Sequence, residues 1–349
     1  MNSVNRPVKN ILFLTGLFIL LIGLLSCEQS PASFAFNGQT MGTTYHITVV
    51  KGDKQPASEL SQSEIDELLL EVNASFSTYI DSSEVSMFNH YKGIDAQSKT
   101  SEFVELIEEA QRINLLTGGA YDITVGPLVN LWGFGPSFKE DDIPSDELIE
   151  HALSNVGFDN ILVDVDNKRV GKLKPEVYVD FSSIAKGYGV DRLANLIESK
   201  GYSNYMVEIG GEMRVKGHNP KGTRWRIAIE KPDTATRAIH RIINVTNVAM
   251  ATSGDYRNFF LKDGVQFSHT INPKTGKPVR HNLASVTVLN DSAATADALA
   301  TAFMVLGDKK GYDLAIKNEL PVLFLIKQGD GFNELMTPAF KILIEDYES

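Results

Sequence analysis

A stretch of small and apolar residues near the carboxyl end, residues 291–306, constrains the fold of this chain more than any other part of the sequence. Its apolar positions recur at helical spacing, and a glycine, Gly307, follows the last of them. These positions are Ala296, Leu299, Ala300, Phe303 and Met304. The pattern predicts a helix that ends at Gly307 and has a small-residue packing face.

Two polar residues of this predicted helix lie on one side of it. Asp297 and Thr301 are four residues apart, so a carboxylate and a hydroxyl project from the same face one turn apart. Such hard oxygens suit a small cation, and the backbone carbonyls of residues 292–295 lie within reach of the same point. Two interpretations are open: a metal site, or a solvated carboxylate beside a threonine that fills a packing face.

Length and charge narrow the class of protein. The chain has 349 residues, which is about two average domains or one large mixed domain, and 43% of them are hydrophobic, enough for a sizeable core. Acidic residues outnumber basic ones by 44 to 33, and the net charge is -11. No basic run is interleaved with aromatic residues, so we do not expect a nucleic-acid partner.

The first 27 residues resemble a bacterial lipoprotein signal. Arg6 and Lys9 precede an apolar run over residues 11–25, which is too short for a comfortable membrane span. The only cysteine of the chain, Cys27, follows Ser26 directly after that run. We expect cleavage before a lipidated Cys27, a short tether over residues 28–33, and a mature body over residues 34–349; an ordinary secretory signal or an uncleaved anchor is the alternative.

The body alternates helical and strand-like patterns without an internal repeat. Helices are expected from residue 65 to 76 behind a capping box at residues 61–64, and over residues 101–116 and 145–156. Strands are expected over residues 44–50, 161–165, 176–180, 205–209, 225–230, 242–248 and 285–289, and a polar turn over residues 251–257. The prediction is one compact α+β unit with mixed sheets and flanking helices.

Three irregular segments carry residues suited to a ligand. Residues 120–135 mix glycines with flat aromatic side chains, so they form either a buried irregular loop or a ligand wall. Residues 180–189 run from a predicted strand through a small-residue turn into a helix, where backbone N–H groups collect anions such as phosphate; plain helix capping is the alternative. His269 lies in a loop that also contains two prolines. Three roles are open for it: a base, a phosphate partner or a hydrogen-bonding surface residue.

The succession of these segments along the chain resembles the FAD:protein FMN transferases, the ApbE-type lipoproteins. The resemblance runs in order from about residue 36 to the carboxyl end. It covers residues 41–43, 77–79, 120–128, 131–134, 180–189, 208–212, 252–254, 269–278 and 295–301. The resemblance implies a T-fold-like α+β fold that binds FAD with Mg²⁺ and transfers FMN to a threonine hydroxyl of a target protein, releasing AMP.

The resemblance also implies site residues. The positions that match FAD contacts of the family are Met41, Tyr79, Ala120, Tyr121, Asp122, Asp180, Lys186 and Ile271. The positions that match its metal ligands are Ser183, Ala294, Asp297 and Thr301, with backbone carbonyls serving at Ser183 and Ala294. Tyr79, Tyr121 and Trp132 are expected to stack on flavin or adenine. The acceptor hydroxyl needs a base, for which His269 is the first candidate and Asp180 the second.

Two other functions fit the same segments. One is a Mg²⁺-dependent periplasmic FAD pyrophosphatase that gives the phosphoryl group to water, and the other is a lipid-anchored FAD-binding protein without catalysis. The expected partners are exported proteins with an acceptor threonine, such as flavin-bearing subunits of respiratory redox pumps, and the membrane itself through the lipid. The protein is expected on the periplasmic side of a bacterial membrane, with inner and outer membrane both open.

Overall fold

The computed structural model describes residues 32–52, 58–136, 143–232, 238–255, 259–262, 265–329 and 331–345. The predicted signal segment, Cys27 and most of the predicted tether lie outside these residues. Within them, we find no helix whose length and apolar content would let it cross a bilayer.

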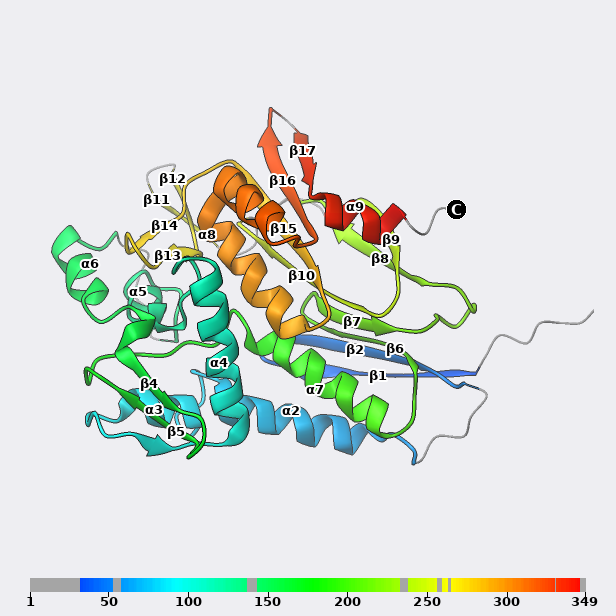
Figure 1. Cartoon of the computed structure of the whole chain (residues 1–349), viewed down its shortest axis with the longest axis horizontal. Helices are drawn as coiled ribbons and strands as arrows, with labels where there is room; N and C mark the ends of the chain where they lie inside the picture. The colour runs from blue at the N-terminus through cyan, green and yellow to red at the C-terminus, as the bar shows by residue number, and fades with distance from the viewer. Residues whose placement is uncertain are drawn as a thin grey trace, which may run out of the picture.

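An eight-stranded sheet forms the centre of the molecule (Figure 1). Its spatial order is β1-β2-β6-β7-β10-β15-β16-β17, and every pairing described in it is antiparallel. The strands are β1 (Ser33–Thr40), β2 (Thr43–Val50), β6 (Asn204–Ile209), β7 (Glu212–Lys216), β10 (Val248–Gly254), β15 (Leu283–Asn290), β16 (Val322–Gln328) and β17 (Gly331–Met336). Together with the helices, this sheet confirms the predicted α+β class.

Both faces of the sheet are covered, because successive side chains of a strand point to opposite sides. In β10, Ala249 and Ala251 belong to the clusters on the helical face, whereas Met250 belongs to the cluster on the other face. The helical face carries α2 (Gln62–Phe76), α7 (Ala185–Ser199) and α8 (Ala293–Lys317). The other face carries the ribbon of β8 (Trp225–Glu230) and β9 (Ile239–Val245) together with α9 (Pro338–Glu345).

A second group of elements packs beside α2 and α8. Its core holds Phe76, Phe103 and Phe181, with ring centroids 5.2 to 6.1 Å apart. The helices are α3 (Glu84–His90), α4 (Ser101–Leu116), α5 (Gly126–Leu131), α6 (Asp146–Leu153) and the 3-10 turns η1 (Ile123–Val125) and η2 (Phe158–Asn160). The strands are β3 (Gln97–Ser98), β4 (Ile161–Asp164) and β5 (Arg169–Lys172), and two small hairpins follow: β11 (Phe259–Lys262) with β12 (Val265–Ser268), and β13 (Ile271–Asn272) with β14 (Lys277–Pro278).

Several predicted helices have the expected ends. The capping box before α2 is present, since the Ser61 side chain accepts from the backbone of Glu64 and the Glu64 side chain accepts from Ser61. Helix α4 spans the predicted residues and begins at a capping Thr100. Gly118 and Gly119 follow it with positive φ angles of 59° and 80°, as a helix stop requires.

The predicted end of α8 at Gly307 is wrong. Gly307 leaves the helical conformation, with φ 76° and ψ 177°, but the helix resumes and runs to Lys317. His281 explains how the break is tolerated: its Nε2 lies 2.6 Å from the carbonyl oxygen of Met304, which the kink removes from the regular helical ladder. Gly307 therefore makes a kink with a side-chain partner, and the helix continues beyond it.

Two strand predictions are also wrong. Residues 176–180 form no strand: residue 176 ends a turn, and the side chain of Asn89 takes the place of a neighbouring strand, because it donates to Val179 O and accepts from Val179 N, both at 2.8 Å. The predicted strand over residues 242–248 is two strands, β9 and β10, separated by Asn247 with φ 51°. Strand β10 continues to Gly254, so the first part of the predicted polar turn is sheet, with Ala251 fully buried.

Candidate functional site

The crossing of α7 and α8 is the structural basis of the site. A Cβ atom on Gly187 would lie 2.2 Å from the carbonyl oxygen of Ala293, so only glycine allows the two helices to approach this closely. The amide of Gly187 donates to Asp297 Oδ2 at 3.2 Å across the crossing. The first turn of α7 therefore faces the first turns of α8, and their polar groups share one space.

Lys186, Asp297 and Glu212 form a charged cluster at this crossing. Lys186 Nζ lies 3.5 Å from Asp297 Oδ2 and 3.1 Å from Glu212 Oε1. Burial by itself would lower the pKa of Lys186, but the charges of Asp297 and Glu212 outweigh it and raise the pKa above its ordinary value. Burial raises the pKa of Glu212, against the opposing effect of the Lys186 charge. The cluster thus holds one ammonium between two carboxyl groups.

Tyr121, Ser183 and Asp180 lie beside this cluster. The Ser183 hydroxyl donates to the Tyr121 oxygen at 3.2 Å. Burial raises the pKa of Tyr121, and the charges of Asp297 and Asp180 raise it further, so its hydroxyl stays protonated. Asp180 is 7% exposed, and its Oδ1 accepts from the amide of Ser182 at 2.8 Å. These residues come from two segments, Tyr121 from one and Asp180 and Ser183 from the turn before α7, and the charges of Asp297 and Asp180 both act on Tyr121.

Thr301 and Ala294 lie on the same helix as Asp297. The hydroxyl of Thr301 is 3.3 Å from that of Ser253, which comes from β10. The amide of Ala294 donates to Asp191 Oδ2 at 3.0 Å, and Ser292 donates to the same oxygen at 2.7 Å. Asp191 of α7 therefore fixes the start of α8, and with it the positions of Asp297 and Thr301.

Met41 and Tyr79 lie at other edges of the site. Met41 occupies the turn between β1 and β2 with φ 49°, and its Cε would be 2.9 Å from a Cβ on Gly189, in the second turn of α7. Tyr79 is 70% exposed. Although most of the side chain is exposed, partial desolvation of its hydroxyl raises the pKa, and the charge of Asp180 adds to this effect.

Asp122 and Ala120 serve the local fold. Asp122 Oδ1 accepts from the amide and hydroxyl of Thr124, and its Oδ2 accepts from the amide of Phe158. Ala120 is 5% exposed, and its amide donates to Thr117 O. Residues 123–131 form η1 and α5, so the middle of the predicted irregular segment is helical.

The hairpin of residues 269–278 packs against α5 and α6. Ile271 is 6% exposed in a cluster with Leu128 and Trp132. The ring of His269 lies edge-on to Phe134, with the centroids 6.3 Å apart. These contacts place His269 beside Phe134, where α5 ends.

The stacking prediction needs correction for two of its three residues. Trp132 is 4% exposed, lies stacked on Phe267 and donates from Nε1 to Gly276 O at 2.7 Å. Tyr121 is 2% exposed. Neither ring has an open face for a ligand in this structure, so the exposed Tyr79 is the one available for stacking.

The oxygen atoms around Asp297 fit a small hard cation. Mg²⁺ takes one or two protein carboxylates and completes its shell with water and substrate phosphates. Asp297 and Thr301, the predicted ligands, carry a carboxylate and a hydroxyl on the first turns of α8. Across the part of the chain that the structure describes, no group of three or more His, Cys, Asp or Glu side chains could hold a metal ion. A cation here would therefore depend on backbone and phosphate oxygens as well.

Two residues at this site have no role that the sequence predicts. Glu212 follows a Gly-Gly turn, and Ser253 lies in a strand that the pattern presented as a turn. The signal for Glu212 was available: an acidic residue directly after two glycines at the end of a strand. The pairing of Ser253 with Thr301 needs the packing of β10 under α8 and leaves no local signal.

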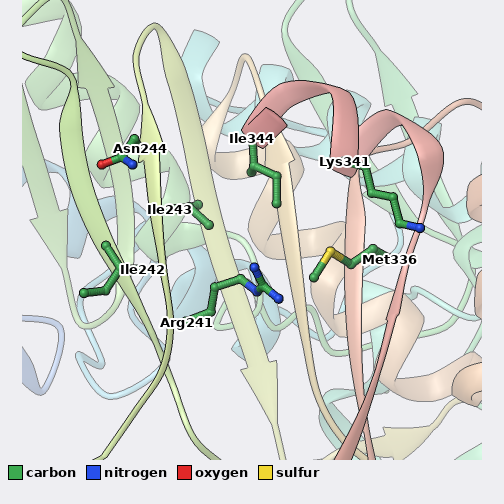
Figure 2. A pocket seen from close by; sticks show the side chains of 7 residues that line it. All are labelled: Arg241, Ile242, Ile243, Asn244, Met336, Lys341 and Ile344. Carbon is green, nitrogen blue, oxygen red and sulfur yellow. The ribbon is translucent and has the colours of Figure 1, made fainter. Parts of the chain in front are cut away.

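A hollow of about 290 Å³ lies elsewhere, between β9 and the β17–α9 segment (Figure 2). Its lining includes Arg241, Met336 and Lys341 and none of the predicted site residues. We therefore do not assign it to the site.

The fold and the cluster define a class of protein: an α+β protein with an oxygen-rich site at a helix crossing, suited to a cation and phosphate groups. Comparison with known proteins identifies the family. The sequence model of the ApbE family matches residues 41–324. The FAD:protein FMN transferase of Vibrio cholerae is 46% identical over 329 residues, which cover 94% of this chain and 98% of that protein. That of Haemophilus influenzae is 44% identical over 94% of this chain and 96% of its own length.

Solved structures agree with these sequence matches. The flavin transferase ApbE from Vibrio cholerae superimposes with a TM-score of 0.83 at 45% identity, over 90% of this chain and 99% of that one. The apo flavinyl transferase ApbE of Pseudomonas stutzeri gives 0.83 at 38% identity, over 90% and 97%. The chain belongs to the ApbE family.

Proposed function

We propose that this protein transfers FMN from FAD to a threonine hydroxyl of a target protein, with Mg²⁺, and releases AMP. Two findings support flavin transfer from FAD to a protein: membership of the ApbE family, and relatives named FAD:protein FMN transferase along nearly the whole chain. The structural observation that carries the proposal is the helix crossing, which sets Asp297 beside Lys186 and Thr301 beside Ser253.

The reaction replaces the bridging oxygen of the FAD pyrophosphate with the threonine oxygen. The threonine oxygen bonds to the phosphorus on the FMN side of FAD, the bond from that phosphorus to the bridging oxygen breaks, and AMP leaves with the bridging oxygen. The threonine proton passes to a base. Negative charge grows on the leaving oxygen and on the phosphoryl group, so catalysis depends on positioning and on charge neutralisation.

The proposed metal ligands and Lys186 have distinct tasks in this reaction. Asp297 and Thr301 would hold Mg²⁺, with backbone carbonyls at Ser183 and Ala294. The bound cation supplies charge neutralisation to the pyrophosphate as a Lewis acid. Lys186 brings a second positive charge, which its raised pKa keeps in place at physiological pH.

The remaining assigned residues bind FAD and move the proton. Tyr79 offers its exposed ring to flavin or adenine. Met41, Ala120, Tyr121, Asp122, Asp180 and Ile271 complete the proposed FAD contacts. His269 is the proposed base and Asp180 the second candidate; the edge-on contact with Phe134 orients the His269 ring.

The cellular setting is part of the proposal. A signal segment of residues 1–27 would place a lipid on Cys27 and tether the residue 34–349 body to the periplasmic side of a bacterial membrane. The acceptors would then be exported proteins with a threonine acceptor, such as flavin-bearing subunits of respiratory redox pumps.

Mass spectrometry tests the proposal. The full-length protein in detergent is mixed with FAD, Mg²⁺ and a target domain that carries a threonine acceptor motif. We expect a covalent FMN adduct on the threonine, which disappears in Asp297→Ala or without a divalent cation. Asp291→Asn is the matched control, since Asp291 is exposed at the approach to the same helix.

Two other results would refute the proposed transferase activity. Free FMN and AMP without an adduct on a second target domain would indicate the pyrophosphatase, and intact FAD after long incubation would indicate a binding protein. Loss of the base is tested separately: if His269→Ala transfers FMN at the wild-type rate, His269 is not the base.

A further inference from the structure

Glu212 is a buried carboxyl group to which the proposed reaction gives no task. It is the first residue of β7 and is 5% exposed. Its Oε1 lies 3.1 Å from Lys186 Nζ, while its Oε2 is buried and has no hydrogen-bond partner among the described residues. Burying a carboxyl group with one oxygen unsatisfied destabilises a fold, so a residue in this state calls for an explanation in function.

The backbone holds this carboxyl group in place. Gly210 and Gly211 precede it with φ angles of 62° and 110°, a left-handed turn that suits glycine. A Cβ on Gly210 would lie 2.8 Å from the Thr43 side chain, so the turn is pressed against β2 and has no room to shift. Glu212 also pairs with Ile209 across the β6–β7 hairpin. The Glu212 side chain thus starts from a rigid point.

The Lys186 ammonium forms ion pairs with two carboxylates, those of Glu212 and Asp297. Lys186 Nζ is closer to Glu212 Oε1, at 3.1 Å, than to Asp297 Oδ2, at 3.5 Å. Both carboxyl groups therefore attract the ammonium from ion-pair distance, and the charge of each raises the pKa of Lys186. Without the charge of Glu212, Asp297 becomes the sole counter-ion in the cluster, and the flexible lysine side chain moves onto it.

We propose that Glu212 is a positioning residue that holds the Lys186 ammonium back from Asp297 and so leaves the Asp297 carboxylate available to a divalent cation. This inference rests on the proposed function, in which Asp297 binds the metal. Glu212 acts through Lys186 and need not touch substrate or metal. Its unsatisfied oxygen is consistent with a group retained for its charge.

Metal affinity, measured without FAD and without turnover, tests the proposal. Full-length protein in detergent is titrated with Mn²⁺ alone, and the free ion is counted by electron paramagnetic resonance. We expect Glu212→Gln, which keeps the shape and loses the charge, to weaken Mn²⁺ binding by about tenfold, a typical size for coupling between neighbouring groups. Glu208→Gln is the matched control: Glu208 lies on the same hairpin and accepts from Gly211 N, as glutamine can.

The double-mutant cycle tests whether the effect passes through the lysine. Lys186→Met removes the competing ammonium, so its Mn²⁺ affinity should equal or exceed that of the wild type. Lys186→Met with Glu212→Gln should then bind Mn²⁺ within about threefold of Lys186→Met alone, because Glu212 has no ammonium left to hold. In turnover, Glu212→Gln should raise the Mg²⁺ concentration needed for half-maximal rate and keep the rate at saturating Mg²⁺ close to wild type.

Three outcomes overturn the inference: an unchanged Mn²⁺ affinity in Glu212→Gln, a double variant as weak as Glu212→Gln, or a weaker affinity in Lys186→Met. The measurement on Lys186→Met tests the inference even if Glu212→Gln fails to fold. Asp297→Ala separates the two proposals. If it leaves Mn²⁺ binding intact, the proposed metal site is wrong; if it abolishes binding while Glu212→Gln does not change it, only the role of Glu212 is wrong.

Discussion

Replacing Gly187 by alanine should test how closely α7 and α8 must approach. The added Cβ would lie 2.2 Å from Ala293 O and 2.7 Å from Ala294 N, both backbone atoms that have no rotamer to change. Carbon atoms pack at about 3.5 Å or more, so the helices would have to separate by roughly 1 Å. Overpacking of this kind costs about 1–3 kcal/mol, whereas alanine favours a helix by about 1 kcal/mol over glycine.

The sign of the stability change is therefore informative. Helix propensity alone predicts that Gly187→Ala is more stable, and the contact predicts that it is less stable by about 1–2 kcal/mol. The separation would also lengthen the bond from Gly187 N to Asp297 Oδ2, and a shift of about 1 Å at a catalytic group can reduce the rate about a hundredfold.

Urea unfolding followed by circular dichroism and the rate of FMN transfer to the target domain measure the two effects. Gly189→Ala is the matched control for stability, since its Cβ would meet side chains and no backbone atom: Met41 Cε at 2.9 Å and Ile209 Cδ1 at 3.2 Å. A Gly187→Ala protein that is at least as stable as the wild type and transfers FMN normally would refute the close-approach argument.

Three further predictions concern stability. Lys172→Met should lower the free energy of unfolding by about 3 kcal/mol in urea, because Lys172 is buried and its Nζ donates to the carbonyls of residues 88, 89, 175 and 177; an unchanged midpoint would contradict this. Burial lowers the pKa of Lys172 to about 8, so between that pH and the ordinary 10.5 the unfolded chain binds the proton that the folded chain has released. The stability of the wild type relative to Lys172→Met should therefore rise with pH across this window in a pH series of urea titrations, and a fall would show the sign to be wrong. His281→Phe should cost about 1–2 kcal/mol by thermal unfolding, since it leaves Met304 O without its partner at the kink, whereas a neutral result would mean that water replaces the imidazole.

Local signals in the sequence predicted the helices best. The capping box at Ser61 and Glu64 and the bounds of α4 follow from residues within one or two turns of each helix end, because caps and apolar spacing act over that range. The stretch that opens α8 is helical as predicted, and its Asp297 and Thr301 contact Lys186 and Ser253.

Predictions that needed a distant partner were less successful. Val177 and Val179 alternate with polar residues and are fully buried, yet their segment pairs with the side chain of Asn89 and with Ile123 O, about 90 and 57 residues away in the sequence, and forms no strand. An alternating pattern indicates which side chains are buried. It does not indicate which groups form hydrogen bonds with the backbone between them. Trp132 was likewise expected to stack on flavin or adenine, and it is a buried core residue.

The sequence alone determined the class of fold, the capped start of α2, the ends of α4 and the family resemblance that the comparisons confirm, because short-range spacing, caps and motif order depend on neighbouring residues. Only the tertiary structure decided that Lys186 meets both Asp297 and Glu212, and that Ser253 meets Thr301. Lys186 lies 111 residues before Asp297 and Ser253 lies 48 residues before Thr301, and the packing of α7 and β10 against α8 brings them together. Charge and burial depend on distances in space, and spacing along a single helix records only which of its faces is apolar.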